Sequence, residues 1–568
     1  MKKIFLRAVV LLLVLSLALS AFASCGEIGK QDNDAQSEKE EVNDSEKTSD
    51  DEGASDDEGA SDDTTPDDET ASDDNTSDDN EIGTEGLAYT LLDNDTYEVS
   101  AGSAKEATEI VIPSKYNGKP VTSIASAAFR FCKGLISIDI PNSVTSIGSY
   151  AFEYCDGLTS IDIPDSVTSI GAEAFRYCAA LTSVTIGNGV ESINRDAFYG
   201  TAYYNNESNW ENGVLYIGKY LIKAKDDISG DYSVKEGTKI IATNAFYNCT
   251  GLTSMVIPDS VTSIGGGAFY LCTALTSIDI PDSVTSIGFY AFQYCTGLTS
   301  VTIGNGVESI GSSAFSETAY YNNESSWENG VLYIGKYLIK AKSNISGDYS
   351  VKEGTKIIAS NAFQECTGLK SVRIGNGVES IGDCAFQACT GLTSIDIPDS
   401  VTSIGDIAFN KCTGLTSIDI PDSVTSIGDD AFLCCDGLTS VTIGNGVERI
   451  GMYAFYECTG LTSINIPDSV KSIGRYAFYE CTGLTSIDIP DSVTSIGDDA
   501  FYECTGLTSV MIGNGVESIG VWAFYNCTGL TSIKFRGTEA KWNAIEKGAG
   551  WNYAVPASCQ IIFNYTGE

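Results

Sequence analysis

The sequence predicts a β-rich solenoid of about sixteen 23-residue coils, built from short strands and short helical turns. Fourteen cysteines recur at intervals of 23 residues, in three runs that begin at Cys132, Cys249 and Cys366. An Ala-Phe pair occurs sixteen times in the same array, from Phe129 to Phe524. A fixed period of this length is typical of units that bury their apolar face only against their neighbours. We therefore expect function to lie on a long repetitive surface rather than in one pocket.

Each repeat is expected to contain a strand, a turn, a second short strand and a tight return. In the repeat that starts at Leu158, the spacing Leu-x-x-Ile-x-Ile places Leu158, Ile161 and Ile163 on one buried face of a strand. Pro164 then predicts a turn, because proline cannot continue a β-ladder. Five repeats carry Ile-Gly-Asn-Gly-Val at this turn. We interpret that motif as another turn and not as a phosphate loop, because a strand and not a helix follows it.

The Phe and Cys columns should form the core. Coils joined by paired strands stack about 4.8 Å apart, so each ring should lie against the ring of the next coil. Cysteines at that spacing are close enough for disulfides, but this position normally holds a small buried residue, so we expect inert thiols with bridged pairs as the alternative. The repeat has no Cys-x-x-Cys pair for zinc or redox chemistry.

Two near-identical insertions interrupt the array, at about 201–244 and 318–361. Both contain Gly-Val-Leu-Tyr-Ile-Gly-Lys-Tyr-Leu-Ile-Lys-Ala-Lys, in which two alternating runs flank Gly-Lys; we interpret it as a β-hairpin flap. The ends of the array differ from the repeat, as caps must. Tyr89–Tyr97 predicts a hairpin, and Gln560–Phe563 predicts a strand.

The predicted organisation is a signal peptide at 1–24, an acidic disordered linker at 25–86, an N-terminal cap at 87–123, the solenoid at 124–535 and a C-terminal cap at 536–568. Basic residues followed by a 12-residue apolar stretch predict an export signal, which is too short to span a bilayer. Phe22–Gly26 resembles a bacterial lipobox, although Phe replaces the usual Leu. We expect Cys25 to carry a lipid anchor; the alternative is a secreted protein with a free Cys25.

The charge of the chain restricts its partners. Residues 31–80 hold 22 acidic residues and only two lysines, without helical or strand periodicity, and such a segment should stay disordered. The whole chain carries a formal charge of −44. Nucleic acids and anionic membranes both require a basic face on the protein that binds them. We therefore expect no nucleic acid partner, and we expect contact with a membrane only through the N-terminal lipid.

The absence of histidine excludes most catalytic machinery. It removes the Ser-His-Asp triad, the Cys-His dyad, the His-Glu-x-x-His zinc site and histidine proton transfer. A glycosidase with paired carboxylates needs a cleft and an acid with a raised pKa, neither of which an open row of solvated aspartates provides. We expect no enzyme activity, no cofactor and no metal site.

The complete unit Leu-x-x-Ile-x-Ile-Pro-x-x-Val-x-x-Ile-Gly-x-x-Ala-Phe-x-x-Cys resembles the BspA-like leucine-rich repeats of bacterial surface proteins. The resemblance covers about four fifths of the chain, including the Thr-Ala-Tyr-Tyr-Asn-Asn insertions and the Gly-Thr-Glu-Ala-Lys-Trp cap. It implies a leucine-rich-repeat solenoid that is displayed on the cell surface or secreted, and it implies that the protein can act as an adhesin. It supplies no catalytic residues.

The residue between the two inward isoleucines is the most variable position of the first strand, so we expect it to carry recognition. The candidates at this position are Asp139, Asp162, Asp279, Arg373, Asp396, Asp419 and Asp488. Neighbouring carboxylates such as Asp396 and Asp419 could bind a cation or a basic protein surface; alternatively, the column only keeps the strand face soluble.

Aromatic residues form a second candidate. Trp210 and Trp327 lie in the insertions, where they would suit sugar or protein contacts or else form each insertion's own small core. The tyrosines that follow Ala-Phe in four late repeats could line another edge of the array; they are Tyr456, Tyr479, Tyr502 and Tyr525.

We expect a cell-surface or secreted protein that binds an extracellular protein or polysaccharide through many weak repeated contacts, which avidity strengthens. The alternative is an envelope scaffold or spacer that associates with itself, because a discriminating site usually needs more local variation than these repeats show.

Overall fold

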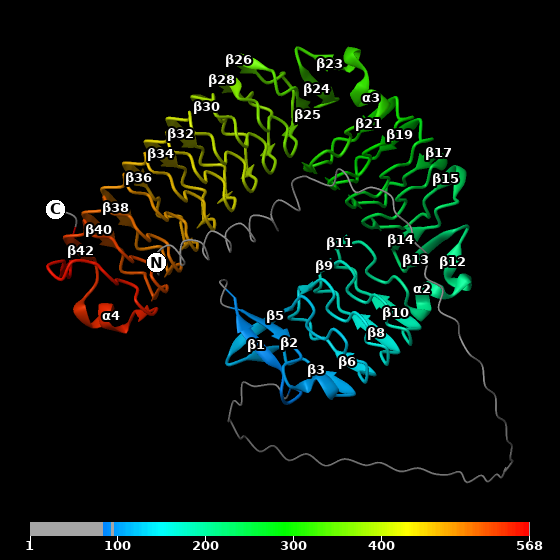
Figure 1. The fold of residues 1–568 in the computed structure, drawn as a ribbon, viewed down its shortest axis with the longest axis horizontal. Helices are drawn as coiled ribbons and strands as arrows, with labels where there is room; N and C mark the ends of the chain where they lie inside the picture. Colours follow the sequence, from blue (N-terminus) through cyan, green and yellow to red (C-terminus); the bar gives the residue numbers. More distant parts are fainter. Residues whose placement is uncertain (1–82, 93–95, 567–568) are drawn as a thin grey trace, which may run out of the picture. The chain divides into compact units, whose positions relative to one another are not determined.

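The computed structural model describes residues 83–92 and 96–566, and these form a β-solenoid (Figure 1). The predicted signal peptide, Cys25 and residues 25–82 of the predicted linker lie outside the described residues. Residues 83–86, predicted as part of the linker, join the solenoid, where the Thr84 N–H donates to the carbonyl oxygen of Val111 over 3.0 Å. Successive coils stack through two parallel ladders, one for each strand of the repeat. The array has about 19 turns. This exceeds the sixteen predicted from the Ala-Phe pairs, because the insertions and the caps also contribute strands to both ladders.

The first ladder consists of the strands that carry the Leu-x-x-Ile-x-Ile pattern, together with strands from the insertions and caps. Its strands are β3 (Glu109–Val111), β6 (Ser137–Asp139), β8 (Ser160–Ile163), β10 (Ser183–Ile186), β15 (Ser229–Ser233), β17 (Gly251–Val256), β19 (Ser277–Ile280), β21 (Ser300–Ile303), β26 (Ser346–Ser350), β28 (Gly368–Arg373), β30 (Ser394–Asp396), β32 (Ser417–Ile420), β34 (Ser440–Ile443), β36 (Ser463–Asn465), β38 (Ser486–Ile489), β40 (Ser509–Ile512), β42 (Ser532–Phe535) and β44 (Gln560–Ile562). In β8 the residues alternate between exposed and buried, as the spacing predicts.

The second ladder follows the turn of each coil. Its strands are β2 (Tyr97–Ser100), β5 (Lys119–Ile124), β7 (Ser146–Ile147), β9 (Ser169–Ile170), β11 (Ser192–Ile193), β14 (Tyr220–Ala224), β16 (Ile240–Ile241), β18 (Ser263–Ile264), β20 (Ser286–Ile287), β22 (Ser309–Ile310), β25 (Tyr337–Ala341), β27 (Ile357–Ile358), β29 (Ser380–Ile381), β31 (Ser403–Ile404), β33 (Ser426–Ile427), β35 (Arg449–Ile450), β37 (Ser472–Ile473), β39 (Ser495–Ile496), β41 (Ser518–Ile519) and β43 (Glu546–Lys547). This ladder forms three sheets, and the first ladder is divided into seven shorter ones.

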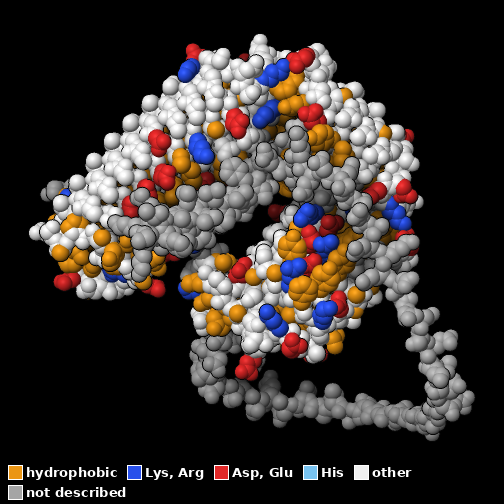
Figure 2. Space-filling model, in the orientation of Figure 1, with side chains coloured by type: hydrophobic (Ala, Val, Ile, Leu, Met, Phe, Trp, Pro, Cys, Tyr) orange, Lys and Arg blue, Asp and Glu red, His pale blue; other side chains and the backbone are white. Residues whose placement is uncertain are grey.

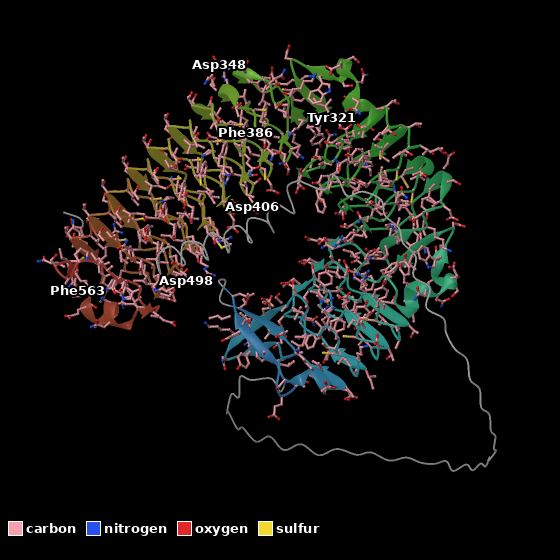
Figure 3. All side chains as sticks on the ribbon, viewed as in Figure 1. Tyr321, Asp348, Phe386, Asp406, Asp498 and Phe563 are labelled. Carbon is pink, nitrogen blue, oxygen red and sulfur yellow. The ribbon has the colours of Figure 1, made fainter. Side chains whose placement is uncertain are left out.

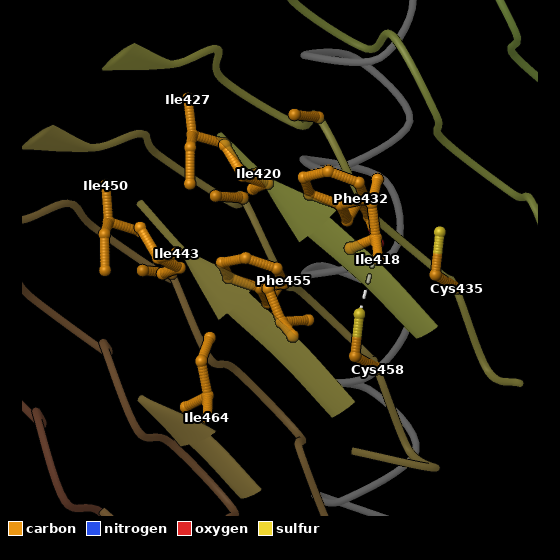
Figure 4. Close-up of a cluster of buried hydrophobic side chains, with 14 of the residues drawn as sticks. Ile418, Ile420, Ile427, Phe432, Cys435, Ile443, Ile450, Phe455, Cys458 and Ile464 are labelled. Carbon is orange, nitrogen blue, oxygen red and sulfur yellow. Dashed lines mark hydrogen bonds between the residues drawn. The ribbon is translucent and has the colours of Figure 1, made fainter. Parts of the chain in front are cut away.

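The Phe column lies in the core, as predicted. Phe432 and Phe455 are completely buried and stack with their ring centroids 5.3 Å apart (Figure 4). The backbone of each return turn bonds the next coil, as in the 2.8 Å bond that the Phe432 N–H donates to the carbonyl oxygen of Ala454. Each ring therefore contributes both apolar burial and a fixed distance between coils.

The cysteine column consists of unbridged thiols; all seventeen cysteines in the described part of the chain are free. Each thiol in the regular coils donates to the carbonyl oxygen of a Phe in the preceding coil, as Cys458 does to Phe432 over 3.1 Å (Figure 4). Burial raises the pKa of Cys132 to about 11 and that of Cys389 to about 12. The column therefore holds poorly reactive thiols that are part of the core.

The Ile-Gly-Asn-Gly-Val segments are turns, and four of the five lie directly on the Pro-Asp-Ser turn of the coil before; the fifth, at Gly375, follows an insertion that lacks this turn. Asp165 accepts the backbone N–H of Asn188 over 2.6 Å, and Asp422 accepts that of Asn445 over 2.7 Å. A Cβ atom at Gly189 would lie 1.8 Å from the carbonyl oxygen of Asp165. Glycine is required there because the two backbones are in contact.

Each insertion contains the predicted hairpin, but the hairpin is not a projecting flap. Strand β13 (Val214–Ile217) pairs antiparallel with β14, and β14 pairs in parallel with β16 of the next coil. All four residues of β13 are buried. In the second insertion, β24 (Val331–Ile334) and β25 repeat the arrangement. The prediction of a flap was wrong because Val-Leu-Tyr-Ile is apolar on both faces and needs cover on both.

The two hairpins divide the core into three clusters. Leu215 and Ile217 face the cluster of the first coils, whereas Val214 and Tyr216 face the cluster of the middle coils. The second hairpin separates the middle cluster from the last one in the same way. Because neighbouring residues of a strand point to opposite faces, one hairpin completes two cores.

The remaining elements belong to the insertions and caps. They are β1 (Ala88–Leu91), β4 (Lys115–Tyr116), β12 (Trp210–Glu211), β23 (Trp327–Glu328), α2 (Ala202–Asn205), α3 (Ala319–Asn322), α4 (Glu539–Ala544) and the 3-10 turns η1 (Ala104–Glu106), η2 (Glu207–Asn209) and η3 (Glu324–Ser326). Strand β1 pairs antiparallel with β2, which is the hairpin expected near the N-terminal end. At the other end, β44 extends the first ladder, and the buried Trp542 of α4 packs on Phe535.

Candidate binding surfaces

The exposed position of the first ladder forms a continuous column, as predicted. Parallel pairing places Asp162 beside Thr185, Asp279 beside Thr302 and Arg373 beside Asp396. All seven predicted column residues are exposed; they are Asp139, Asp162, Asp279, Arg373, Asp396, Asp419 and Asp488. The strand-face column, as we call these residues, therefore presents its charges to solvent.

Several of these carboxylates already have partners. The Thr185 hydroxyl donates to Asp162, and the Thr302 hydroxyl donates to Asp279. Asp488 accepts a 2.8 Å bond from the guanidinium of Arg536, two coils further on. These contacts hold the carboxylates in place at the surface, and none of them encloses a ligand-sized space.

The neighbouring aspartate pairs lie where the first ladder is interrupted. Asp139 and Asp162 lie in β6 and β8, and Asp396 and Asp419 lie in β30 and β32; at both places the first ladder is interrupted between the two strands. Like charges on adjacent strands oppose pairing. Within 83–92 and 96–566 no group of three or more potential ligand residues is arranged to hold a metal ion.

A shallow groove crosses the turns next to the column. Asp279, Asp282, Thr302 and Asn305 line it, together with Asp259 and Pro281. Asp282 accepts the backbone N–H of Asn305 over 2.7 Å, so this carboxylate supports the turn of the next coil. The groove is polar and open, which suits an extended chain better than an enclosed small molecule.

Trp210 and Trp327 are packed into their own insertions. The Trp210 indole N–H donates to the carbonyl oxygen of Tyr204 over 2.8 Å, and its ring lies edge-to-face with the Tyr204 ring. Trp327 makes the same two contacts with Tyr321. Both indoles are half-buried. Of the two interpretations of these residues, the structure supports that of a small local core.

The tyrosines that follow Ala-Phe form a ladder across the last coils. The centroids of Tyr456, Tyr479, Tyr502 and Tyr525 are 4.6–4.7 Å apart, and the rings are nearly parallel. The ladder continues 5.2 Å further to Tyr553 in the C-terminal cap, which the repeat pattern does not predict. The first four rings are half-buried and Tyr553 is 63% exposed. Burial raises the pKa of Tyr456, Tyr479 and Tyr502.

Two carboxylates with raised pKa values directly precede the Ala-Phe pairs of their coils. Asp499 is only 5% exposed, and burial, followed by the charge of Asp498, raises its pKa to about 6. Burial and the neighbouring Asp429 raise the pKa of Asp430 to about 7. Figure 3 places Asp498 on the edge of the array opposite to Asp348 of the first ladder. The sequence signal for Asp430 and Asp499 is the Asp-Asp pair that precedes Ala-Phe in their repeats.

In the first coils an ion-pair network occupies the ladder position, just after Ala-Phe, and the positions just before that pair. Glu153, which is 2% exposed, accepts a 2.6 Å bond from Nε of Arg130. Arg176 contacts both Glu153 and Glu173, and Arg195 also pairs with Glu173. The same location in the repeat therefore supports different side-chain chemistry in different parts of the array.

Among the described residues, no helix has the length and apolar character that a membrane-spanning segment needs.

The sequence model of the BspA type leucine rich repeat region matches residues 102–229, 216–346, 332–462 and 448–549. No curated protein is similar enough in sequence to match the chain. Among solved structures, a leucine-rich repeat protein from Bacteroides ovatus is 23% identical over 84% of this chain and 98% of its own, with a TM-score of 0.31.

Two further structures match a similar share of the chain. A leucine rich cell surface protein from Faecalibacterium prausnitzii is 26% identical over 82% of this chain and 98% of its own, with a TM-score of 0.24. The pneumococcal vaccine antigen PcpA is 19% identical over 85% of this chain and 98% of its own, with a TM-score of 0.25. At these TM-scores none of the three supports an argument about the ligand of this chain.

Proposed function

The chain belongs to the BspA-type leucine-rich repeat family, and from this membership we propose that it is a bacterial surface or secreted protein that binds an extracellular protein or polysaccharide through its strand face. The observation that carries the proposal is the strand-face column. It varies in charge and size, whereas the Thr and Ser residues around it hardly change. In Figure 2 the edge that carries β28 to β40 is mostly white, with isolated acidic and basic side chains.

Binding of this kind depends on repetition. Each coil offers one variable side chain, and a single contact of an exposed side chain contributes little free energy. A polymeric or multivalent partner that reaches several coils adds these contacts without a new entropic cost for each one, so that its overall affinity increases. Proteins of this fold are generally non-catalytic, and the absence of histidine agrees with a binding role.

Anchoring through Cys25 remains part of the proposal. A lipid on this cysteine would hold the protein at the cell envelope, with the acidic segment between the anchor and the solenoid. Mass spectrometry of the N-terminal peptide from the producing cell tests it. A diacylated Cys25 supports anchoring, and an N-terminus generated by cleavage without lipid shows simple secretion.

The binding test uses the full chain on an array of extracellular matrix proteins, mucins and polysaccharides at near-physiological salt. The test variant is Asp396→Ala with Asp419→Ala, and the control is Glu191→Ala with Glu308→Ala, which removes two exposed carboxylates from the second ladder. Deleting an insertion is unsuitable because its hairpin completes two cores. Saturable binding that only the test variant loses supports the proposal. Binding that both variants retain places the contact elsewhere.

A scaffold that associates with itself is the second candidate, and the uniform Thr and Ser rows of the strand face favour it. Sedimentation of the full chain over a wide concentration range distinguishes the two. Reversible association without any ligand on the array would replace the adhesion proposal with the scaffold.

A further inference from the structure

We propose that the tyrosine ladder of the last coils, with the glutamates beside it, is a second binding surface that accepts a cationic polypeptide. This proposal does not rest on the strand face, because the two surfaces use different positions of the repeat. The ladder comprises Tyr456, Tyr479, Tyr502, Tyr525 and Tyr553. The residue after each of the first three tyrosines is a glutamate: Glu457, Glu480 and Glu503.

The fold does not need tyrosine at this position. The coils just after the second hairpin carry Gln364, Gln387 and Asn410 there, and Gln364 donates to Gln387 over 2.8 Å. Backbone bonds between coils are the same in both parts. The Phe386 N–H bonds Ala408 over 2.8 Å, and the Phe478 N–H bonds Ala500 over 2.8 Å. Coils with an amide side chain at this position therefore stack through the same backbone bonds as coils with a tyrosine. The tyrosines expose aromatic surface that the solenoid itself does not require.

The exposed aromatic surface is concentrated at the C-terminal end of the ladder. Trp522 is 48% exposed and lies edge-to-face with Tyr525, 6.2 Å from centroid to centroid. Tyr553 is 63% exposed and is the last ring of the ladder. Figure 2 shows hydrophobic side chains gathered at the surface over this end of the array. Tyrosine and tryptophan in such a patch are the residues that contribute most to protein interfaces.

Charge identifies the occupant. Residues 451–530 contain nine acidic and only two basic residues, Lys471 and Arg475. Nε of Arg475 lies 3.7 Å from Asp498, so this cation is already paired. The three glutamates follow the tyrosines coil by coil, and all three are half-exposed. A lysine- or arginine-rich segment would pair with these carboxylates, place its aliphatic stems on the ring edges, and stack a guanidinium on the outer face of Tyr553.

The molecule provides matched substitutions for a test. Tyr456→Gln, Tyr479→Gln and Tyr502→Gln together install the side chain that Gln387 has at the same position. Glu457→Ala, Glu480→Ala and Glu503→Ala together install the side chain of Ala388. Glu191→Ala with Glu308→Ala, which removes two exposed carboxylates outside the last coils, is the control variant.

Surface plasmon resonance on the full chain would measure binding of poly-L-arginine, poly-L-glutamate and neutral dextran. We expect saturable binding of poly-L-arginine alone, which weakens as salt is added. Each triple variant should weaken it by at least about tenfold, and the Glu191→Ala, Glu308→Ala control should not. Unchanged affinity in both triple variants, or equal binding of dextran, would overturn the proposal.

Hydrogen exchange gives a second readout on the unmodified chain, so the result does not depend on how the variants fold. Poly-L-arginine should protect amides in 453–530 and leave those in 364–433 unchanged, although both segments have the same backbone bonding. Protection of both segments to the same degree would mean general attraction to an acidic protein, and the ladder would then have no specific role.

Discussion

The strand face and the return-turn face of the last coils differ in what repetition has preserved. On the strand face, Thr and Ser recur in almost every coil, and only the column between the isoleucines varies. On the return-turn face, the residue after Ala-Phe changes from glutamine to tyrosine between Gln387 and Tyr456, while the backbone bonds stay constant. The comparison shows that the coil fixes its inward positions and leaves each outward row free to diverge over a few neighbouring coils.

The largest expected effect is in the core that both faces share. Phe432→Ala in a middle coil should lower the free energy of unfolding by about 3–5 kcal/mol, because it removes a buried ring and leaves a cavity between two others. The midpoint of urea unfolding, followed by circular dichroism, measures the change. A loss below about 1 kcal/mol would mean that the coils close around the missing ring.

The second effect is a pH-dependent change in stability that we expect on the return-turn face and not on the strand face. The pKa of Asp499 is raised in the folded state to about 6, so folding becomes less favourable as pH rises from the unfolded value through about 6. Asp499→Asn should therefore stabilise the protein by about 1–3 kcal/mol at pH 8 and lose this advantage near pH 4. Melting temperatures at the two pH values test it. An advantage that is the same at both pH values would contradict the role of ionisation.

A smaller effect tests whether the ladder contributes to stability. Tyr479→Gln should cost only about 0.5–1.5 kcal/mol, the usual contribution of a stacked aromatic pair. Gln387→Ala, at the same position of an earlier coil, is the matched control. Denaturant unfolding of both variants provides the comparison. A loss of about 3 kcal/mol or more for the tyrosine would show that the ladder belongs to the core and is not a surface feature.

The smallest effect is expected on the strand face. Asp419→Ala should change stability by less than about 0.5 kcal/mol, because the carboxylate is exposed. Differential scanning calorimetry against the unmodified chain measures it. A loss above about 1 kcal/mol would give the column a structural role and would weaken its use as a recognition surface.

The sequence was sufficient to predict the coil but not the insertions. Period, inward isoleucines, turns and the Phe column are all local signals, and each coil repeats them. The hairpins were misplaced because alternation suggested a strand with one solvated face, whereas Val214–Ile217 is apolar at every position and is covered on both. That uninterrupted apolar run was the available signal.

The candidate surfaces were predicted unevenly. The strand-face column follows from strand alternation alone, so its exposure could be read from the repeat. The ladder could be traced as far as Tyr525, but Tyr553 lies in the cap, outside the 23-residue spacing, and only the folded chain brings it to Tyr525. The burial of Asp499 depends on packing between neighbouring coils, which a single repeat does not contain.

The two hairpins also affect how such a protein can change in length. A strand that is apolar on both faces covers the last coil of one core cluster and the first coil of the next, so each hairpin caps two clusters inside the array. Coils added or removed between the two hairpins would therefore lengthen or shorten the middle cluster alone. Such a change in the number of coils would leave the packing of the other two core clusters intact.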